Sequence, residues 1–122
     1  MSVQGTRLLF RTNPGGAAVP GGTTVDLTSE FPRGVCIASY PAIRMASGNR
    51  FSAELPVTIR LVLVLNNEQF SCLDTFTLLP GGQYSAAYNV PGTRLKVFAE
   101  TASGSGNAFV DFALFGFAPY NA

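Results

Sequence analysis

The side chains that could carry out chemistry are few and widely spaced in this sequence. There is no histidine, and the seven acidic residues include no DxD or ExxxE cluster of the kind that general acid–base catalysis uses. Asp74 and Asp111 stand within apolar stretches, where we expect them to be buried and paired with Arg60, Arg94 or Lys96. Such pairs are usually structural, so the sequence predicts that the chain is not an enzyme and has no catalytic residue.

Candidate ligands for a metal or a cofactor are equally sparse. Cys36 and Cys72 are far apart, with no CxxC motif, so zinc would have too few ligands. Residues 66–68, Asn-Asn-Glu, offer too few oxygen atoms for calcium. The glycine-rich residues 103–107 lack a following lysine and lead into a strand, which indicates a flexible turn and not a phosphate loop. We therefore expect no metal and no cofactor.

The two cysteines, Cys36 and Cys72, allow three interpretations. They are small buried apolar residues, or they form a disulfide within the chain, or they form disulfides between neighbouring subunits. The last arrangement requires an oxidising environment. In the first interpretation, replacement of both cysteines leaves the fold and any assembly intact.

The composition indicates one domain whose surface is poor in charge. The 122 residues are 47% hydrophobic and 12% charged, about half the usual charged share. Because monomers rarely expose large apolar patches, we expect copies of the same chain to cover part of this surface. The net charge is +1 and the eight basic residues are scattered singly, so nucleic acid is not an expected partner.

Neither a membrane span nor a secretion signal is expected. The longest apolar run, residues 61–65, is far shorter than the roughly 18 residues that a spanning helix needs. Residues 1–7 lack the basic and apolar regions of a Sec signal peptide. The expected location, outside the cell or on the cell or spore surface, therefore involves no recognisable Sec signal.

The pattern of turns and strand-forming residues predicts an all-β chain. Pro-Gly pairs at 14–15, 20–21, 80–81 and 91–92 are turn signals, and the segments between them are rich in Val, Ile, Thr, Phe and Tyr. We expect a single-domain antiparallel β-sandwich of jelly-roll type, with a hairpin turning at residues 66–68. The expected strands are 6–12, 23–27, 35–40, 43–46, 56–66, 70–79, 83–90, 93–101 and 108–117.

Two of these strands are apolar on both faces. Alternation places Val62 and Val64 opposite the face of Ile59, and places Phe112 and Leu114 opposite the face of Phe109. Only one face of a strand can pack in the sandwich core. We therefore predict that Val62, Val64, Phe112 and Leu114 contact a neighbouring subunit.

Residues 1–22 are expected to form an N-terminal arm and linker, ahead of a sandwich over residues 23–122. Residues 13–22 contain four Gly and two Pro, which separates a strand-like segment from the body. One interpretation is an ordinary long loop of the same sandwich. The other is a hinge that lets the arm pair with a neighbouring subunit, with Leu8 and Phe10 filling its groove.

Part of the chain resembles a known family. Residues 73–82, Leu-Asp-Thr-Phe-Thr-Leu-Leu-Pro-Gly-Gly, and residues 88–93, Tyr-Asn-Val-Pro-Gly-Thr, resemble the endospore appendage subunits of spore-forming bacteria, over about residues 56–117. The resemblance implies a jelly roll with a flexible N-terminal connector that docks into another subunit, and sheets that join side by side in extracellular fibres. The connectors of that family carry cysteines for intersubunit disulfides, whereas residues 1–22 here contain none.

These features favour a structural subunit that assembles with copies of itself into an extracellular filament or surface appendage. One alternative is a coat or decoration protein of a virus or phage. Another is a carbohydrate-binding module, but carbohydrate is not indicated because the chain has no Trp. The aromatic candidates for a sugar platform are Tyr40, Tyr84, Tyr88 and Tyr120.

Overall fold

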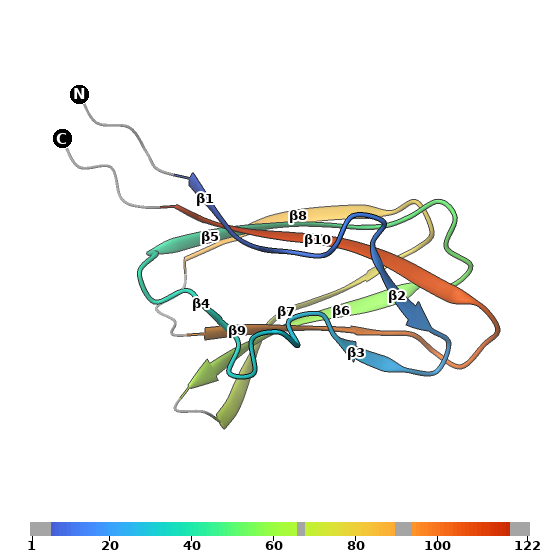
Figure 1. Cartoon of the computed structure of the whole chain (residues 1–122), viewed down its shortest axis with the longest axis horizontal. Helices are drawn as coiled ribbons and strands as arrows, with labels where there is room; N and C mark the ends of the chain where they lie inside the picture. Colours follow the sequence, from blue (N-terminus) through green and yellow to red (C-terminus); the bar gives the residue numbers. More distant parts are fainter. Residues whose placement is uncertain (1–5, 66–67, 90–93, 118–122) are drawn as a thin grey trace.

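Two antiparallel β-sheets lie face to face and enclose the core (Figure 1). The computed structural model describes residues 6–65, 68–89 and 94–117, and these residues contain strands but no helix. The antiparallel all-β sandwich predicted from the sequence is confirmed. The strands are β1 (Thr6–Arg11), β2 (Ala17–Pro20), β3 (Thr24–Asp26), β4 (Val35–Cys36), β5 (Ala42–Asn49), β6 (Val57–Leu65), β7 (Glu68–Leu78), β8 (Gln83–Tyr88), β9 (Arg94–Glu100) and β10 (Asn107–Phe117).

The first sheet, called sheet A here, has the strand order β1-β10-β5-β8, and β2 also pairs with β10. The pairing of β1 runs from Thr6 opposite Phe117 to Arg11 opposite Ala113, and β2 continues along the same strand from Ala17 opposite Val110. β1 and β2 therefore act as one interrupted edge strand.

The second sheet, sheet B, repeats this layout with the order β3-β9-β6-β7, and β4 also pairs with β9. Here β3 and β4 form the interrupted edge. Apart from the β6–β7 hairpin and the links within the two interrupted edges, each connection passes from one sheet to the other. Double-sheet jelly rolls have this layout of two four-stranded sheets, so the jelly-roll type is our interpretation of the strand order.

One expected linker contains a strand. Residues 17–20 form β2 on the edge of sheet A, where a Pro/Gly-rich connector was the expectation. Val19 has no exposed surface, and its burial in the core explains why this segment pairs with β10 despite its composition. In the isolated chain, residues 6–20 thus belong to the sandwich, and a functional boundary at residue 22 stays a prediction about the assembled protein.

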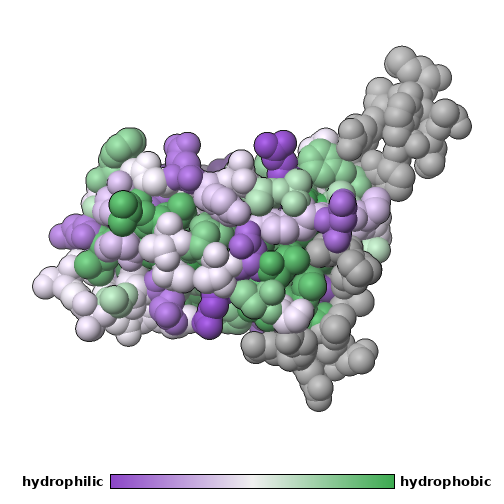
Figure 2. Space-filling view, turned by 180° about the vertical axis from the view of Figure 1, so that it is seen from behind, coloured by the Kyte–Doolittle hydropathy of each residue, from purple (hydrophilic) through white to green (hydrophobic). Residues whose placement is uncertain are grey.

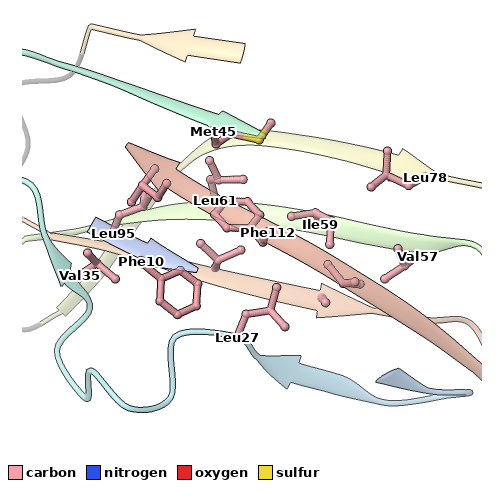
Figure 3. Close-up of a cluster of buried hydrophobic side chains, with 14 of the residues drawn as sticks. Phe10, Leu27, Val35, Met45, Val57, Ile59, Leu61, Leu78, Leu95 and Phe112 are labelled. Carbon is pink, nitrogen blue, oxygen red and sulfur yellow. The ribbon is translucent and has the colours of Figure 1, made fainter. Parts of the chain in front are cut away.

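The core is filled from alternate positions of the central strands (Figure 3). Along β10 the even-numbered residues point inward and the odd-numbered residues lie partly exposed on the outer side. Phe112 lies near the centre of the core, and its ring centroid is 6.3 Å from that of Phe10 on β1. Phe10 also packs edge-on against Phe31, so one side chain of the N-terminal strand connects β10 to the segment before β4.

A buried asparagine holds one end of the sandwich together. Asn49, at the end of β5, donates from Nδ2 to the carbonyl oxygens of Leu55 at 2.9 Å and Leu78 at 3.2 Å. Its Oδ1 accepts from the backbone N–H of Phe109 at 3.2 Å. One side chain therefore hydrogen-bonds backbone groups of β7, of β10 and of the segment before β6. Buried polar groups need such partners in place of the water that they lose on folding.

We expect Asn49→Ala to lower the free energy of unfolding by about 3 kcal/mol, because it removes three hydrogen bonds to backbone groups. Denaturant unfolding followed by circular dichroism measures the change. Ser47→Ala is the matched control two residues away, since the buried Ser47 Oγ has no hydrogen-bond partner among the described residues. That variant should be within about 0.5 kcal/mol of the parent, or more stable. Equal losses in both variants would contradict this role of Asn49.

Candidate assembly surfaces

Three of the predicted contact residues lie inside the sandwich of their own chain. Phe10, Phe112 and Leu114 are at most 5% exposed and belong to the core cluster. For Phe112 and Leu114 this corrects the prediction that they contact a neighbouring copy. The two faces of β10 are both apolar, but the face of Phe109 also carries Asp111, and a charged residue marks the outward side.

The other predicted contact residues lie outside the central core. Val62 and Val64 are on the outer face of sheet B, but they are only 5% and 6% exposed, so their own chain already covers most of their surface. Leu8, at 47% exposed, points outward from β1. Of the six predicted contact residues, Leu8 therefore offers the largest apolar surface to another molecule.

The outer face of sheet A carries a shallow trough of about 940 Å³. Its floor is a row of small side chains across three strands, Ala113 on β10, Ala46 on β5 and Ser85 on β8. Leu8 and Phe115, which face each other across β1 and β10, line one end. The apolar outer side of β10 thus lies in a broad open hollow, and sequence alternation alone does not reveal a hollow because depth depends on side-chain size in adjacent strands.

Two exposed apolar residues mark the end of the sandwich away from the described chain ends. Phe51 is 89% exposed in the β5–β6 connection, and Leu79 is 65% exposed after β7. The ring of Phe51 lies against Gly81, where a Cβ atom would be 2.5 Å from the ring and the backbone φ is +84°. Glycine is therefore needed at this turn for the ring to lie so close to it.

The edges of β7 and β8 meet at a cluster of polar groups. Asp74 Oδ2 accepts a hydrogen bond from the Tyr88 hydroxyl at 2.5 Å and another from the Tyr84 hydroxyl at 3.3 Å. The ring of Tyr84 lies 4.4 Å from that of Phe76. These contacts join sheet A to sheet B along this edge, and they replace the expected pairing of Asp74 with Arg60, Arg94 or Lys96.

The Asp74 carboxylate changes the acidity of both phenols. Partial burial, together with the hydrogen bond to Asp74 and its negative charge, holds the pKa of Tyr88 far above its ordinary value. The charge of Asp74 raises the pKa of the more exposed Tyr84 as well. Both tyrosines therefore stay neutral hydrogen-bond donors at any physiological pH.

Both cysteines are exposed and free, which corrects the interpretation that they are buried apolar residues. Cys36 is on β4 and Cys72 on β7, the two opposite edges of sheet B. Two strands lie between them, so their backbones are about 14 Å apart at the usual strand spacing. A disulfide within the chain is excluded by this geometry, because it needs Cα atoms closer than about 7 Å.

Three ion pairs form outside this cluster among the described residues. Arg50 binds Asp111 with two hydrogen bonds of 2.8 and 2.9 Å, which again differs from the partners expected for Asp111. Arg60 Nη2 lies 3.9 Å from Glu100 Oε2, and Lys96 Nζ lies 4.0 Å from Asp26 Oδ2. Figure 2 shows the result on one side of the molecule, where hydrophilic residues are scattered among apolar and weakly polar ones.

The described part of the chain contains no group of three or more His, Cys, Asp or Glu that could hold a metal ion. Among the same residues there is no helix long and apolar enough to cross a membrane. Asn66 and Asn67, considered as calcium ligands, and Tyr120, considered for a sugar platform, lie outside the described residues. The candidate contact features among the described residues are the open sheet edges, the exposed apolar side chains and the two exposed thiols.

A comparison with solved structures finds a similar fold. It is a structure described by the words "Bacillus endospore appendages form a novel family of disulfide-linked pili", with a TM-score of 0.55 over 97% of this chain and 89% of the other. The two sequences are 11% identical, so the likeness shows the fold alone. It confirms, at that level, the resemblance inferred from residues 73–82 and 88–93. No family model matches the chain, and no curated protein is similar to it in sequence.

We expect Tyr88→Phe to lower the free energy of unfolding by about 1.5 kcal/mol, the low end for a hydrogen bond to a charged group, since Tyr88 is only half-buried. Tyr84→Phe, whose hydroxyl is farther from Asp74, should cost less. Because the folded pKa of Tyr88 is raised, its contribution is complete below the unfolded value of about 10 and falls as the pH rises above it. Unfolding curves between pH 8 and 11 measure this, and a Tyr88→Phe deficit that does not shrink above pH 10 would contradict it.

Proposed function

We propose that this chain is a structural subunit that assembles with copies of itself into an extracellular filament or surface appendage. The observation that carries the proposal is the strand direction at the open edges of the two sheets. Each sheet ends in strands that pair on one side only within the described chain, β7 and β8 on one side of the sandwich and β1 to β4 on the other.

Strand directions allow each sheet to continue into a second copy. In sheet B, β4, β9, β6 and β7 alternate in direction, and β1, β10, β5 and β8 do so in sheet A. With an even number of alternating strands, an identically oriented copy presents its first strand antiparallel to the last strand of its neighbour. Strand addition of this kind supplies main-chain hydrogen bonds at every step and leaves both ends open for further copies.

Apolar surface strengthens such contacts. The trough of sheet A with Leu8 and Phe115, and the exposed Phe51 and Leu79, lie on a surface that is poor in charge. Burying these side chains against another copy stabilises the contact by about 25 cal/mol for each Å² of apolar surface removed from water. The low charge of the whole chain reduces the repulsion that would oppose stacking of many copies.

The N-terminal strand gives the assembly a second mode of strand addition. β1 pairs with its own β10 in the isolated chain, and Phe10 fills the core there. In the assembly we propose that β1 leaves its own sandwich and makes the same contacts with β10 of a neighbour. Exchange of an identical element keeps every contact and costs little beyond the hinge, for which Gly15 and Gly16, both with positive φ, are suited.

We expect the purified protein to form open filaments at low micromolar concentration, seen by negative-stain electron microscopy. Light scattering should show particles far larger than the 12.9 kDa chain. A clean monomer at tens of micromolar would contradict self-assembly. Closed shells of uniform size would instead support a coat or decoration protein, because a closed shell requires a different arrangement of contacts.

A disulfide that ties β1 to its own β10 tests the exchange. Leu8 and Phe115 are direct partners in the β1–β10 pairing and both line the outer trough, so Leu8→Cys with Phe115→Cys, in a background with Cys36→Ser and Cys72→Ser, can be locked by oxidation. The locked chain should form far fewer filaments in electron micrographs, and smaller particles in light scattering, than the same variant under reductant, because only the sheet edges remain to join its copies. Equal filament yields from the locked and the reduced chain would show that the sheet edges assemble without exchange of β1.

A further inference from the structure

The two thiols occupy matching positions on the two edges of sheet B. On β4, Val35 is buried and points inward while Cys36 is exposed, so Cys36 faces outward. On β7, Cys72 is exposed and pairs with Val62, which lies on the outer face of sheet B. Both thiols are therefore on the same face of the same sheet, at opposite edges, where neither can reach the other.

The geometry points to a disulfide between Cys36 of one copy and Cys72 of the next, closing the junction where sheet B continues from β4 into the neighbouring β7. This inference rests on the proposed assembly and goes beyond it, since it assigns the covalent link, its two residues and its register. β7 of an identically oriented copy is antiparallel to β4. Directly opposite residues in such a pair have Cα atoms about 4.5–5.5 Å apart, within the range that a disulfide requires.

The register follows from the pairings inside the chain. Cys36 pairs with Arg94 on β9, which in turn pairs with Val64 on β6. Cys72 pairs with Val62 on β6, which in turn pairs with Lys96 on β9. Bringing Cys36 opposite Cys72 therefore shifts each copy by two residues along the strand, about 7 Å, while four strands separate successive copies by about 19 Å. An even shift keeps inward residues inward and outward residues outward, so the core of sheet B and its outer face both continue across the junction.

A covalent link also suits the weakness of this edge. β4 has two residues and β3 has three, so this interrupted edge offers only a few main-chain hydrogen bonds to an added strand. Short edge strands protect proteins from indiscriminate pairing, and they hold a partner weakly for the same reason. The strand pairing alone is reversible. A disulfide makes it permanent once the correct neighbour is in place.

The bond forms by thiol–disulfide exchange with a small disulfide such as oxidised glutathione. One protein thiolate attacks its S–S bond, giving a mixed disulfide and releasing one glutathione thiolate. The thiolate of the neighbouring copy then attacks the protein sulfur of the mixed disulfide and releases the second glutathione. Two protein thiols lose two electrons, one oxidised glutathione is reduced to two molecules of glutathione, and the two thiol protons end on them.

Single-cysteine variants of the full chain test which thiols pair. Cys36→Ser retains only Cys72, and Cys72→Ser retains only Cys36. In a buffer of oxidised and reduced glutathione, each variant alone should give little covalent dimer on a non-reducing gel. An equimolar mixture should give at least tenfold more dimer, and the parent chain should give a ladder that dithiothreitol collapses to monomer. Mass spectrometry of the dimer should find the Cys36 peptide joined to the Cys72 peptide.

A relocated thiol is the matched control. Thr77 is exposed on β7 and pairs with Thr58 on the outer face, as Cys72 pairs with Val62. The variant Cys36→Ser, Cys72→Ser, Thr77→Cys, mixed with Cys72→Ser, should cross-link far less than the Cys72-containing partner if the register is the one inferred. Equal yields would show collision of exposed thiols and overturn the inference, as would efficient dimers from either single variant alone.

The outcomes separate this inference from the proposed function. Filaments that form from every variant, but without any Cys36–Cys72 link, would leave the assembly standing and remove the disulfide. A parent chain that stays monomeric under both oxidising and reducing conditions would overturn the proposed assembly together with the disulfide.

Discussion

The alternation of side chains along β10 is the constraint on which the rest of this fold depends. β10 is the one strand of sheet A that pairs with β1, β2 and β5, and its inward side chains run without a break through the core. Because a strand has a period of two, a shift of one residue in any of these pairings would send Phe112 and Leu114 into solvent and Asp111 into the core. The register of the whole first sheet is therefore fixed by the burial of one strand.

That constraint also determines what remains on the outside. Once the even-numbered residues of β10 fill the core, Phe109 and Phe115 have to lie on the outer face, where Phe115 is opposite Leu8 of β1 and Arg44 of β5. Arg50 and Asp111 pair with each other on this face. The molecule thus combines a well-filled interior with an exterior that water solvates poorly, and both properties come from the same apolar sequence.

The sequence was sufficient for the strands with strong alternation and insufficient where tertiary contacts decide. Nine of the strand segments follow from Val, Ile, Thr and aromatic content between Pro-Gly turns, whereas β2 was missed because its prolines and glycines mask a single decisive residue, Val19, which the core buries. The choice between the two faces of β10 needed the charge of Asp111 as a guide. The exposure of Cys36 and Cys72 could not be inferred, since it depends on both strands being at the edges of a sheet, which is a property of the topology and not of the local pattern.

The unequal length of the two sides of sheet B has a consequence for any chain of such molecules. One side is the unbroken strand β7 of eleven residues, and the other is divided between β3 and β4 with a turn-rich segment in between. A subunit rotated by 180° about the normal to the sheet would place a long edge against a long edge and a fragmented edge against a fragmented edge, whereas an identically oriented copy matches unlike sides. A filament built in this way is polar: one end exposes the long edge and the other end exposes the fragmented edge. The two ends therefore differ in chemistry and in the rate at which each gains new subunits.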